Sequence, residues 1–178
     1  ATNAGKTEVA CAIMSVLKHE RALFLVHKKA LLAQARERMA KRFGTIEEHI
    51  GVIGEGKFDP KHFTVATIQS LTRKMPPAKQ RIVRQYLGTI RQLHVDEGHH
   101  TKATTWYKLI RRIDAPWRFL YSGTPFGNDN GLLVEASVGG VVARLRRPER
   151  RHLEHLRADV HVDQAEPAAD HVGAPEQR

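Results

Sequence analysis

Short apolar runs alternate along the chain with segments whose apolar positions follow a helical period. The runs predict buried strands, because a short stretch of consecutive apolar residues suits the interior of a parallel sheet. The periodic segments predict helices that pack one apolar face against that sheet. The predicted helices are residues 8–19, 28–43, 78–87 and 104–113. The predicted strands are residues 21–27 and 62–68 and the first parts of residues 92–100 and 117–126.

The alternation of strands and helices predicts an α/β fold, with a doubly wound parallel sheet that carries helices on both faces. In such sheets, ligands bind at the carboxyl ends of the strands. Polar residues suited to chemistry follow the later predicted strands, in "VDEGHH" and "YSGTPF". We therefore expect the chemistry of this protein at one edge of the sheet.

The composition changes after Val142. From Arg144 to Arg178 only ten residue types occur, without Lys, Ile, Ser, Thr, Phe, Tyr or Trp. Such a segment has too few large apolar side chains to offset the entropy cost of ordering it. We expect a folded domain over residues 1–142 and a poorly structured tail over residues 143–178. The composition of the tail is also typical of GC-rich DNA translated in a shifted frame.

The net charge favours a polyanionic partner. The 178 residues include 29 Lys and Arg against 19 Asp and Glu, which gives a net charge of +10. This excess favours nucleic acid, and the alternative is a solvated surface that is merely basic. The single Cys11 excludes an internal disulfide and suits a reducing compartment, so we expect a cytoplasmic or nucleoid-associated protein. No apolar run is long enough to predict a membrane partner.

The first residues, "ATNAGKT", carry the second half of a phosphate-binding loop. Backbone N–H groups at the start of the following helix would cradle phosphate oxygens. Lys6 would reach the β- and γ-phosphates of a nucleotide, and the Thr7 hydroxyl would bind Mg²⁺. The alternative is a chance Gly-Lys-Thr at a helix start. The first glycine of the full pattern would precede Ala1, so we expect the chain to begin inside its own nucleotide site.

The segment "LHVDEGHH" places Asp96 and Glu97 at the end of an apolar strand. Asp96 can hold Mg²⁺, and a neighbouring carboxylate can orient and deprotonate the attacking water. In "YSGTPF", the hydroxyls of Ser122 and Thr124 could bond to the region of His99. The alternatives are a solvated loop for the carboxylates and an ordinary turn for the hydroxyls.

The order of "ATNAGKT", "LFLVHKKALLAQ", "HFTVATIQSL", "VDEGHH" and "FLYSGTPF" resembles the first motor domain of a superfamily 2 helicase. The resemblance covers residues 1–142. Within superfamily 2, the chain resembles the DEAD/DEAH-type group. Within that group it resembles the DNA repair, phage and type III restriction proteins of the XPB and UvsW kind. It implies a RecA-like P-loop NTPase fold, ATP and Mg²⁺ as cofactors, and nucleic acid as a partner, with DNA favoured over RNA. It also implies a second RecA-like domain that supplies an arginine finger, so we expect the chain alone to hydrolyse ATP slowly.

The resemblance also implies roles for single residues. It assigns nucleotide binding to Ala4, Gly5, Lys6 and Thr7. It assigns catalysis to Lys6, Asp96 and Glu97, with Mg²⁺ bound by Thr7 and Asp96. It assigns to His99, Ser122 and Thr124 the coupling between ATP hydrolysis and movement along the nucleic-acid strand. It assigns contacts with the nucleic-acid backbone to His27, Lys28, Thr67, Gln69 and Ser70.

Several alternative functions remain open at this point. The chain could be the motor part of a restriction enzyme, which uses the same motifs, or a truncated module that binds nucleic acid without catalysis. A P-loop kinase or transferase is disfavoured because it would not need "VDEGHH" followed by "YSGTPF". A metal site of His94, His99 and His100 is conceivable, but no second group of ligands accompanies them. We expect Cys11 to be a core residue.

Overall fold

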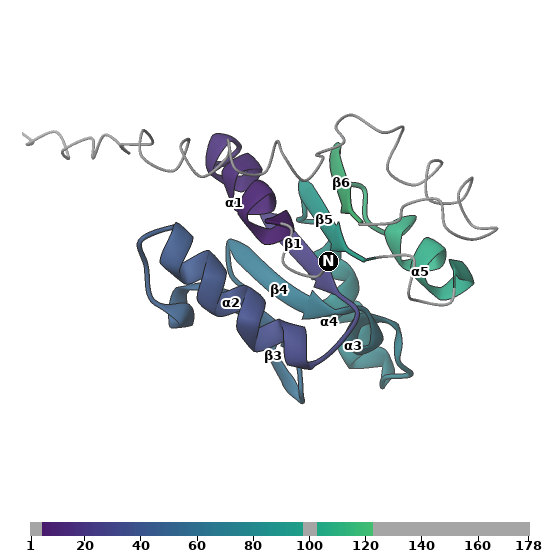
Figure 1. Ribbon diagram of the computed structural model, residues 1–178. Coiled ribbons are helices and arrows are strands. Elements are labelled where there is room, and N and C mark those ends of the chain that lie inside the picture. Colours follow the sequence, from purple (N-terminus) through teal and green to yellow (C-terminus); the bar gives the residue numbers. More distant parts are fainter. Residues whose placement is uncertain (1–4, 98–102, 123–178) are drawn as a thin grey trace, which may run out of the picture. The chain divides into compact units, whose positions relative to one another are not determined.

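The computed structural model describes residues 5–97 and 103–122, with the side chains of the second range described from residue 105 onward (Figure 1). The contacts of the chain divide it into Ala1–Ala143 and Arg144–Arg178, and all of the described residues belong to the first unit. The tail expected over residues 143–178 lies outside the described residues. Its boundary and its lack of packing therefore stay predictions.

The described part of the chain forms a six-stranded sheet in the order β3-β2-β4-β1-β5-β6. Neighbouring strands are parallel except for β2 and β3, which are antiparallel. The parallel strands therefore bring their carboxyl ends to the same edge of the sheet. The strands are β1 (Ala22–Val26), β2 (Gly51–Gly54), β3 (Lys57–Asp59), β4 (Phe63–Thr67), β5 (Gln92–Asp96) and β6 (Trp117–Tyr121).

Helices cover both faces of this sheet, which confirms the predicted α/β architecture. Figure 1 shows α1 and α2 in front of the sheet, with α3 and α4 behind it. The helices are α1 (Lys6–Val16), α2 (Ala30–Arg42), α3 (Ile68–Thr72), α4 (Pro77–Leu87) and α5 (Ala103–Ile110), with a short 3₁₀ helix, η1 (Glu47–His49). Within the described residues, no helix is long and apolar enough to cross a membrane.

Two separate apolar cores lie on the two faces of the sheet, because successive strand residues point to opposite faces. Phe24 of β1 packs on one face and its neighbours Leu23 and Leu25 pack on the other. We call these the α1/α2 core and the α3–α5 core. The α1/α2 core is built around Ala10, Cys11, Met14, Phe24, Leu32, Met39, Val65 and Tyr121. The α3–α5 core is built around Leu23, Leu25, Leu71, Tyr86, Leu93, Trp106, Leu109 and Ile110.

The structure also contains elements that the apolar pattern did not predict. The strands β2 and β3 are short and are joined by a turn at Glu55 and Gly56, both of which have a positive φ, 51° and 84°. The strand predicted over residues 62–68 ends at Thr67, because the Thr67 hydroxyl accepts a hydrogen bond from the Ser70 amide and caps α3. A cap residue of this kind starts a helix where the apolar run alone suggests a continuing strand.

Candidate functional site

The amino-terminal end of α1 lies beside the carboxyl end of β5, at the edge of the sheet. Gly5 precedes the helix with φ 71° and ψ 12°, a left-handed conformation that glycine adopts without strain. The first-turn N–H groups of a helix have no partner within the helix, and the helix dipole makes this end positive. Lys6 and Thr7 are the first residues of α1. This end of the helix therefore suits an anion such as phosphate.

The carboxylate pair lies at the carboxyl end of β5. Asp96 is the last residue of the strand, and Glu97 follows with φ 49°, a strained conformation for a residue other than glycine. The Glu97 amide donates to the Tyr121 carbonyl oxygen at 2.9 Å. The Ser122 hydroxyl donates to Glu97 Oε2 at 3.3 Å. The end of β6 therefore holds Glu97 through both its backbone and its side chain.

The two halves of the site meet in space although they are far apart in sequence. Lys6 Nζ forms a close ion pair with Glu97 Oε1 and lies 3.9 Å from Asp96 Oδ1. The side chains of Lys6, Asp96 and Glu97 are 14%, 16% and 14% exposed, so water screens these charges only weakly. The cation offsets the repulsion between the adjacent carboxylates. This convergence is the arrangement that the sequence motifs predict.

A pocket opens beside this ion cluster, between the amino-terminal end of α1 and the inner side of α2. Lys6, Thr7, Asp96 and Glu97 line it together with residues of β1 and α2. Two polar lining residues, Gln34 and Arg38 of α2, were not predicted to belong to the site. Their spacing of four positions beside the apolar stripe of the helix was the signal that could have identified them.

The oxygen donors of the pocket suit Mg²⁺. The Thr7 hydroxyl and the Asp96 carboxylate are hard oxygen ligands. Over residues 5–97 and 105–122, no group of three His, Cys, Asp or Glu side chains could hold a metal ion. Mg²⁺ does not require such a group, because it keeps several waters and is bound by one or two carboxylates and the phosphates of a nucleotide.

The residues predicted to contact nucleic acid lie together at the carboxyl ends of β1 and β4. Gln69 Nε2 donates to the His27 carbonyl oxygen at 2.8 Å, which ties the two segments to each other. Lys28 and Gln69 are exposed, whereas Thr67 is buried and caps α3. The Thr67 hydroxyl also lies 2.7 Å from Ser70 Oγ. The structure thus gathers these five residues, and their contact with nucleic acid stays a prediction.

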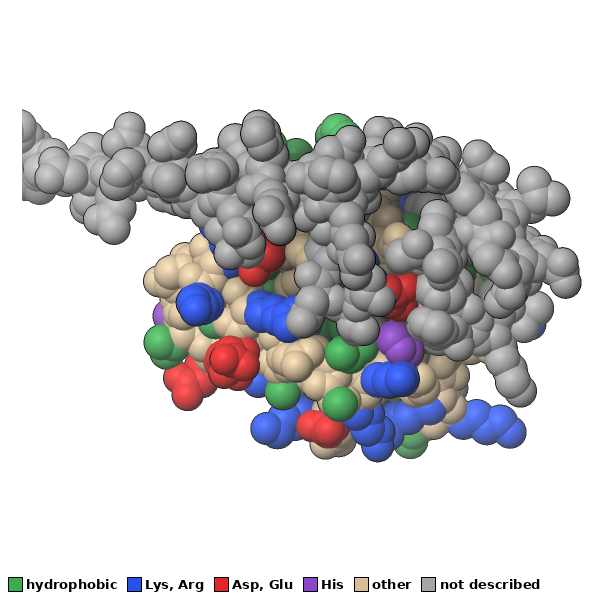
Figure 2. Space-filling model, viewed as in Figure 1, with side chains coloured by type: hydrophobic (Ala, Val, Ile, Leu, Met, Phe, Trp, Pro, Cys, Tyr) green, Lys and Arg blue, Asp and Glu red, His purple; other side chains and the backbone are tan. Residues whose placement is uncertain are grey.

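The turn between β2 and β3 lies next to this cluster. A Cβ atom added to Gly54 would lie 2.6 Å from Leu32 Cδ1, 3.6 Å from Thr67 Cγ2 and 3.8 Å from Ser70 Oγ. The adjacent β3 begins at the exposed Lys57. Figure 2 shows Lys and Arg side chains gathered over β3 and α3, where Arg73 and Lys74 are also exposed. The surface around the predicted contacts therefore carries several exposed basic residues, with the acidic Glu55 and Asp59 also exposed beside Lys57.

Some predicted residues lie outside the described part of the chain, namely Ala4, His99, His100 and Thr124. Cys11 is 1% exposed in the α1/α2 core, as expected, and burial raises the pKa of its thiol to about 12. His94 is fully buried and hydrogen-bonded to Tyr121 and Gln92.

Comparisons with known proteins agree with the fold. The family described as "Type III restriction enzyme, res subunit" matches residues 1–127. Among solved structures, the UvsW helicase from Bacteriophage T4 is similar, with a TM-score of 0.60 and 17% sequence identity. The likeness concerns the fold, and it covers 78% of this chain and 50% of that one, so the chain spans about half of its length. No curated protein matches the chain.

Proposed function

The chain belongs to the family of the type III restriction enzyme res subunit and has the fold of a helicase motor domain, and on that premise we propose that it binds ATP with Mg²⁺ and hydrolyses it while contacting a nucleic-acid backbone. The observation that carries the proposal is the meeting of Lys6 with Asp96 and Glu97 beside an open pocket. A cation, two carboxylates and a helix terminus at one place suit a nucleotide phosphate with its metal ion.

The residues at the start of α1 would bind the phosphates. Backbone N–H groups at this helix start would donate to the phosphates, with Ala4, Gly5, Lys6 and Thr7 as the predicted binding residues, and the Lys6 side chain would contact the phosphate oxygens. Thr7 and Asp96 would hold Mg²⁺, which would supply charge neutralisation at the phosphates. Because Lys6 is already ordered and mostly buried by its ion pairs, little side-chain entropy is lost when nucleotide binds.

Glu97 would act as the general base for the attacking water. Its backbone and side-chain bonds to Tyr121 and Ser122 fix its carboxylate next to the pocket. A positioned carboxylate can accept a proton from water as the water oxygen bonds to the γ-phosphorus and the bond from that phosphorus to the β–γ bridging oxygen breaks, which releases ADP. Ser122, with His99 and Thr124, would couple hydrolysis to movement along the nucleic-acid strand. Ser122 is suited to this role because its hydroxyl joins the end of β6 to Glu97 directly.

Nucleic acid would bind at the carboxyl ends of β1 and β4, next to the pocket, which His27 also lines. Exposed Lys28 and Gln69 are suited to phosphate contacts that carry no sequence information. His27 and Ser70 complete the predicted surface, and the buried Thr67 would support it by capping α3. We favour DNA over RNA because of the likeness to repair helicases. A second RecA-like domain would supply the arginine finger that accelerates hydrolysis.

The direct test of the nucleotide site is a titration with a fluorescent ATP analogue in the presence of Mg²⁺. Lys6→Ala removes the cation that would face the phosphates and should weaken binding by about tenfold or more, because a charge-assisted hydrogen bond contributes about 1.5–3 kcal/mol. Lys18→Ala, at an exposed position beyond the other end of α1, is the matched control and should bind like the parent chain. Equal affinity of the Lys6 variant and the control would refute the proposed nucleotide site.

A second candidate function is the motor part of a restriction enzyme, which the description of the matching family favours. The two candidates share ATP hydrolysis and differ in what the whole protein does to DNA. Cleavage of a DNA substrate by the whole protein, dependent on ATP, would favour the restriction enzyme. Strand separation or translocation without cleavage would favour the helicase.

A further inference from the structure

A chain of buried hydrogen bonds runs through the α1/α2 core beneath the ion cluster. It begins at Gln92, the first residue of β5, which is fully buried. Gln92 Nε2 lies 2.7 Å from the Leu17 carbonyl oxygen and 2.8 Å from the Glu20 carbonyl oxygen, both just beyond the end of α1. Both amide hydrogens are therefore used, and the amide oxygen of Gln92 faces the other way, toward His94.

The remaining bonds can be satisfied in only one direction. His94 Nε2 lies 3.2 Å from Gln92 Oε1, an acceptor, so Nε2 carries a hydrogen and donates. Because His94 is fully buried and stacked against Phe119, where a charged imidazolium would be costly, the ring is neutral and Nδ1 is an acceptor. Tyr121 Oη lies 2.8 Å from this Nδ1 and donates to it. The chain thus leads from the end of α1 to the end of β6.

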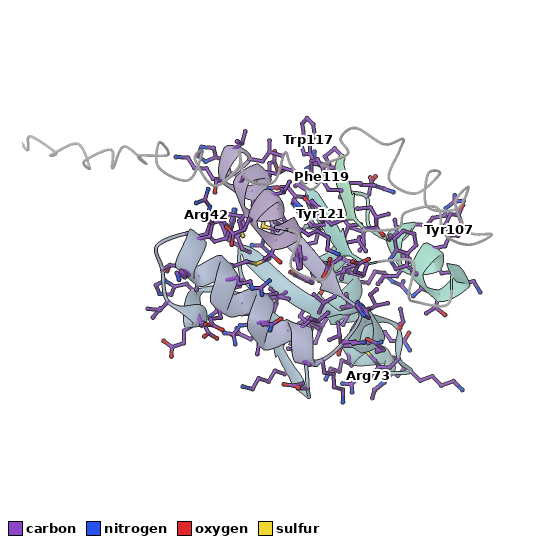
Figure 3. The ribbon with its side chains drawn as sticks, in the orientation of Figure 1. Arg42, Arg73, Tyr107, Trp117, Phe119 and Tyr121 are labelled. Carbon is purple, nitrogen blue, oxygen red and sulfur yellow. The ribbon has the colours of Figure 1, made fainter. Side chains whose placement is uncertain are left out.

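Ring packing holds the last link in place. The His94 and Tyr121 rings are parallel within 1°, and the Phe119 ring stacks on His94 with centroids 5.0 Å apart. Figure 3 shows Phe119 and Tyr121 of β6 on the side of the sheet where α1 lies. The backbone of Tyr121 accepts the amide hydrogen of Glu97 and is followed by Ser122, which bonds the Glu97 side chain. The Tyr121 hydroxyl therefore anchors the strand end that holds Glu97.

We propose that Gln92, His94 and Tyr121 are positioning residues, which tie the end of α1 to the end of β6 and thereby fix Glu97 beside Lys6. The significance of this position rests on the role proposed for Glu97. Buried imidazole and amide groups must each be satisfied or they destabilise the core. A complete and directional chain of this kind specifies one arrangement of the strand end, which an apolar core would specify less sharply.

The test is the residue-resolved exchange of amide hydrogens, measured by NMR on the whole chain. Tyr121→Phe keeps the ring and removes the hydroxyl, which leaves His94 Nδ1 without its donor. The Glu97 amide should then exchange about tenfold faster, because local opening near the broken link costs less free energy. Amides at the centre of β1, such as that of Leu25, should change much less. Tyr86→Phe is the matched control, since Tyr86 is 6% exposed in the opposite core, and it should leave Glu97 exchange unchanged.

A double variant separates a positioning role from a general loss of stability. If the hydroxyl acts through His94, Tyr121→Phe should add no further acceleration at Glu97 in a His94→Leu background. Equal acceleration at all sheet amides, an unchanged Glu97 amide, or fully additive effects would each overturn the proposal. These outcomes are independent of nucleotide binding. If the parent chain binds no ATP analogue, the proposed function fails, whereas the exchange data still decide whether Tyr121 positions Glu97.

Discussion

The two faces of the sheet bury different kinds of side chains. On the α3–α5 face, strand residues such as Leu23, Leu25 and Leu93 pack into a core of aliphatic and aromatic groups. On the α1/α2 face, Gln92 and His94 are fully buried beside apolar groups and are joined by hydrogen bonds. The ion cluster and its pocket lie at the edge of the sheet beside α1 and α2. The comparison indicates that one face mainly supplies stability, while the other combines stability with buried polar groups next to the ion cluster.

The largest effect, on the rate of ATP hydrolysis, should come from a change at Glu97, which follows the end of β5. Glu97→Gln should reduce ATP hydrolysis by about 10²–10⁴-fold, because an amide cannot accept the proton from water. Affinity for ATP should remain, since Lys6 and the helix terminus are unchanged. Phosphate release is best measured with a second RecA-like domain present in the same protein. Normal turnover in this variant would exclude Glu97 from catalysis. It would also contradict the proposal that the α1/α2 face places groups that act on ATP.

A cavity in the α3–α5 core should affect stability and leave the site intact. Leu93 is fully buried, and Leu93→Ala should lower the free energy of unfolding by about 2–5 kcal/mol. Urea denaturation measures this loss, with Ile82→Ala at a half-exposed position of α4 as the control. The folded fraction of Leu93→Ala should bind the ATP analogue as the parent does. A large loss of affinity in that fraction would mean that the two faces are not separable in this way.

His94, which follows Leu93 in β5 and faces the α1/α2 core, should make the stability of the fold depend on pH. Burial holds the pKa of His94 at about 3 in the folded chain, against an ordinary value of 6.5. The unfolded chain therefore binds one more proton between these values, and the stability that His94 contributes is present above pH 6.5 and lost as the pH falls toward 3. At pH 5 the loss should be about 2 kcal/mol. His94→Leu should remove this part of the slope, whereas His19→Leu at an exposed position should not. Parallel slopes for both variants would contradict the burial of a neutral His94.

The smallest effect, on the affinity for single-stranded DNA, should come from removing the exposed charge of Lys28. Lys28→Ala should weaken binding to single-stranded DNA by only a few-fold, and the slope of log affinity against log salt should fall by about 0.7 for the lost phosphate contact. Stability and nucleotide affinity should not change, because Lys28 is exposed. Fluorescence anisotropy at several salt concentrations measures the slope, with Lys18→Ala as the control. An unchanged slope in Lys28→Ala would exclude this residue from the nucleic-acid surface.

The longer elements of the fold could be predicted from sequence because their signals are local. The run of β1 and the periodic apolar positions of α2 identify both elements without knowledge of their neighbours. The strands β2 and β3 escape this method, since each is short and β3 is largely exposed. The place of β2 in the sheet depends on its pairing with β4, which is a tertiary contact, and β3 joins the sheet by pairing with β2.

The ion cluster was predictable for a topological reason, because parallel strands bring their carboxyl ends to one edge. Lys6, Asp96 and Glu97 therefore meet as their motifs indicate. The chain of hydrogen bonds through Gln92, His94 and Tyr121 was not predicted. Gln92 and His94 lie two positions apart on one face of a strand, which is a visible signal, but their partners come from the segment after α1 and from β6. Only the folded arrangement shows that these polar groups are satisfied.

The most direct measurement of the central claim is the change in backbone amide chemical shifts when Mg²⁺ and a non-hydrolysable ATP analogue are added to the whole chain. The account predicts shifts centred on Gly5, Lys6 and Thr7 and on the ends of β1 and β5, with smaller changes along the inner side of α2. Amides of the α3–α5 core, such as that of Tyr86, should not move. No shift at the start of α1, or shifts confined to the α3–α5 face, would contradict the assignment of a nucleotide site to this edge of the sheet.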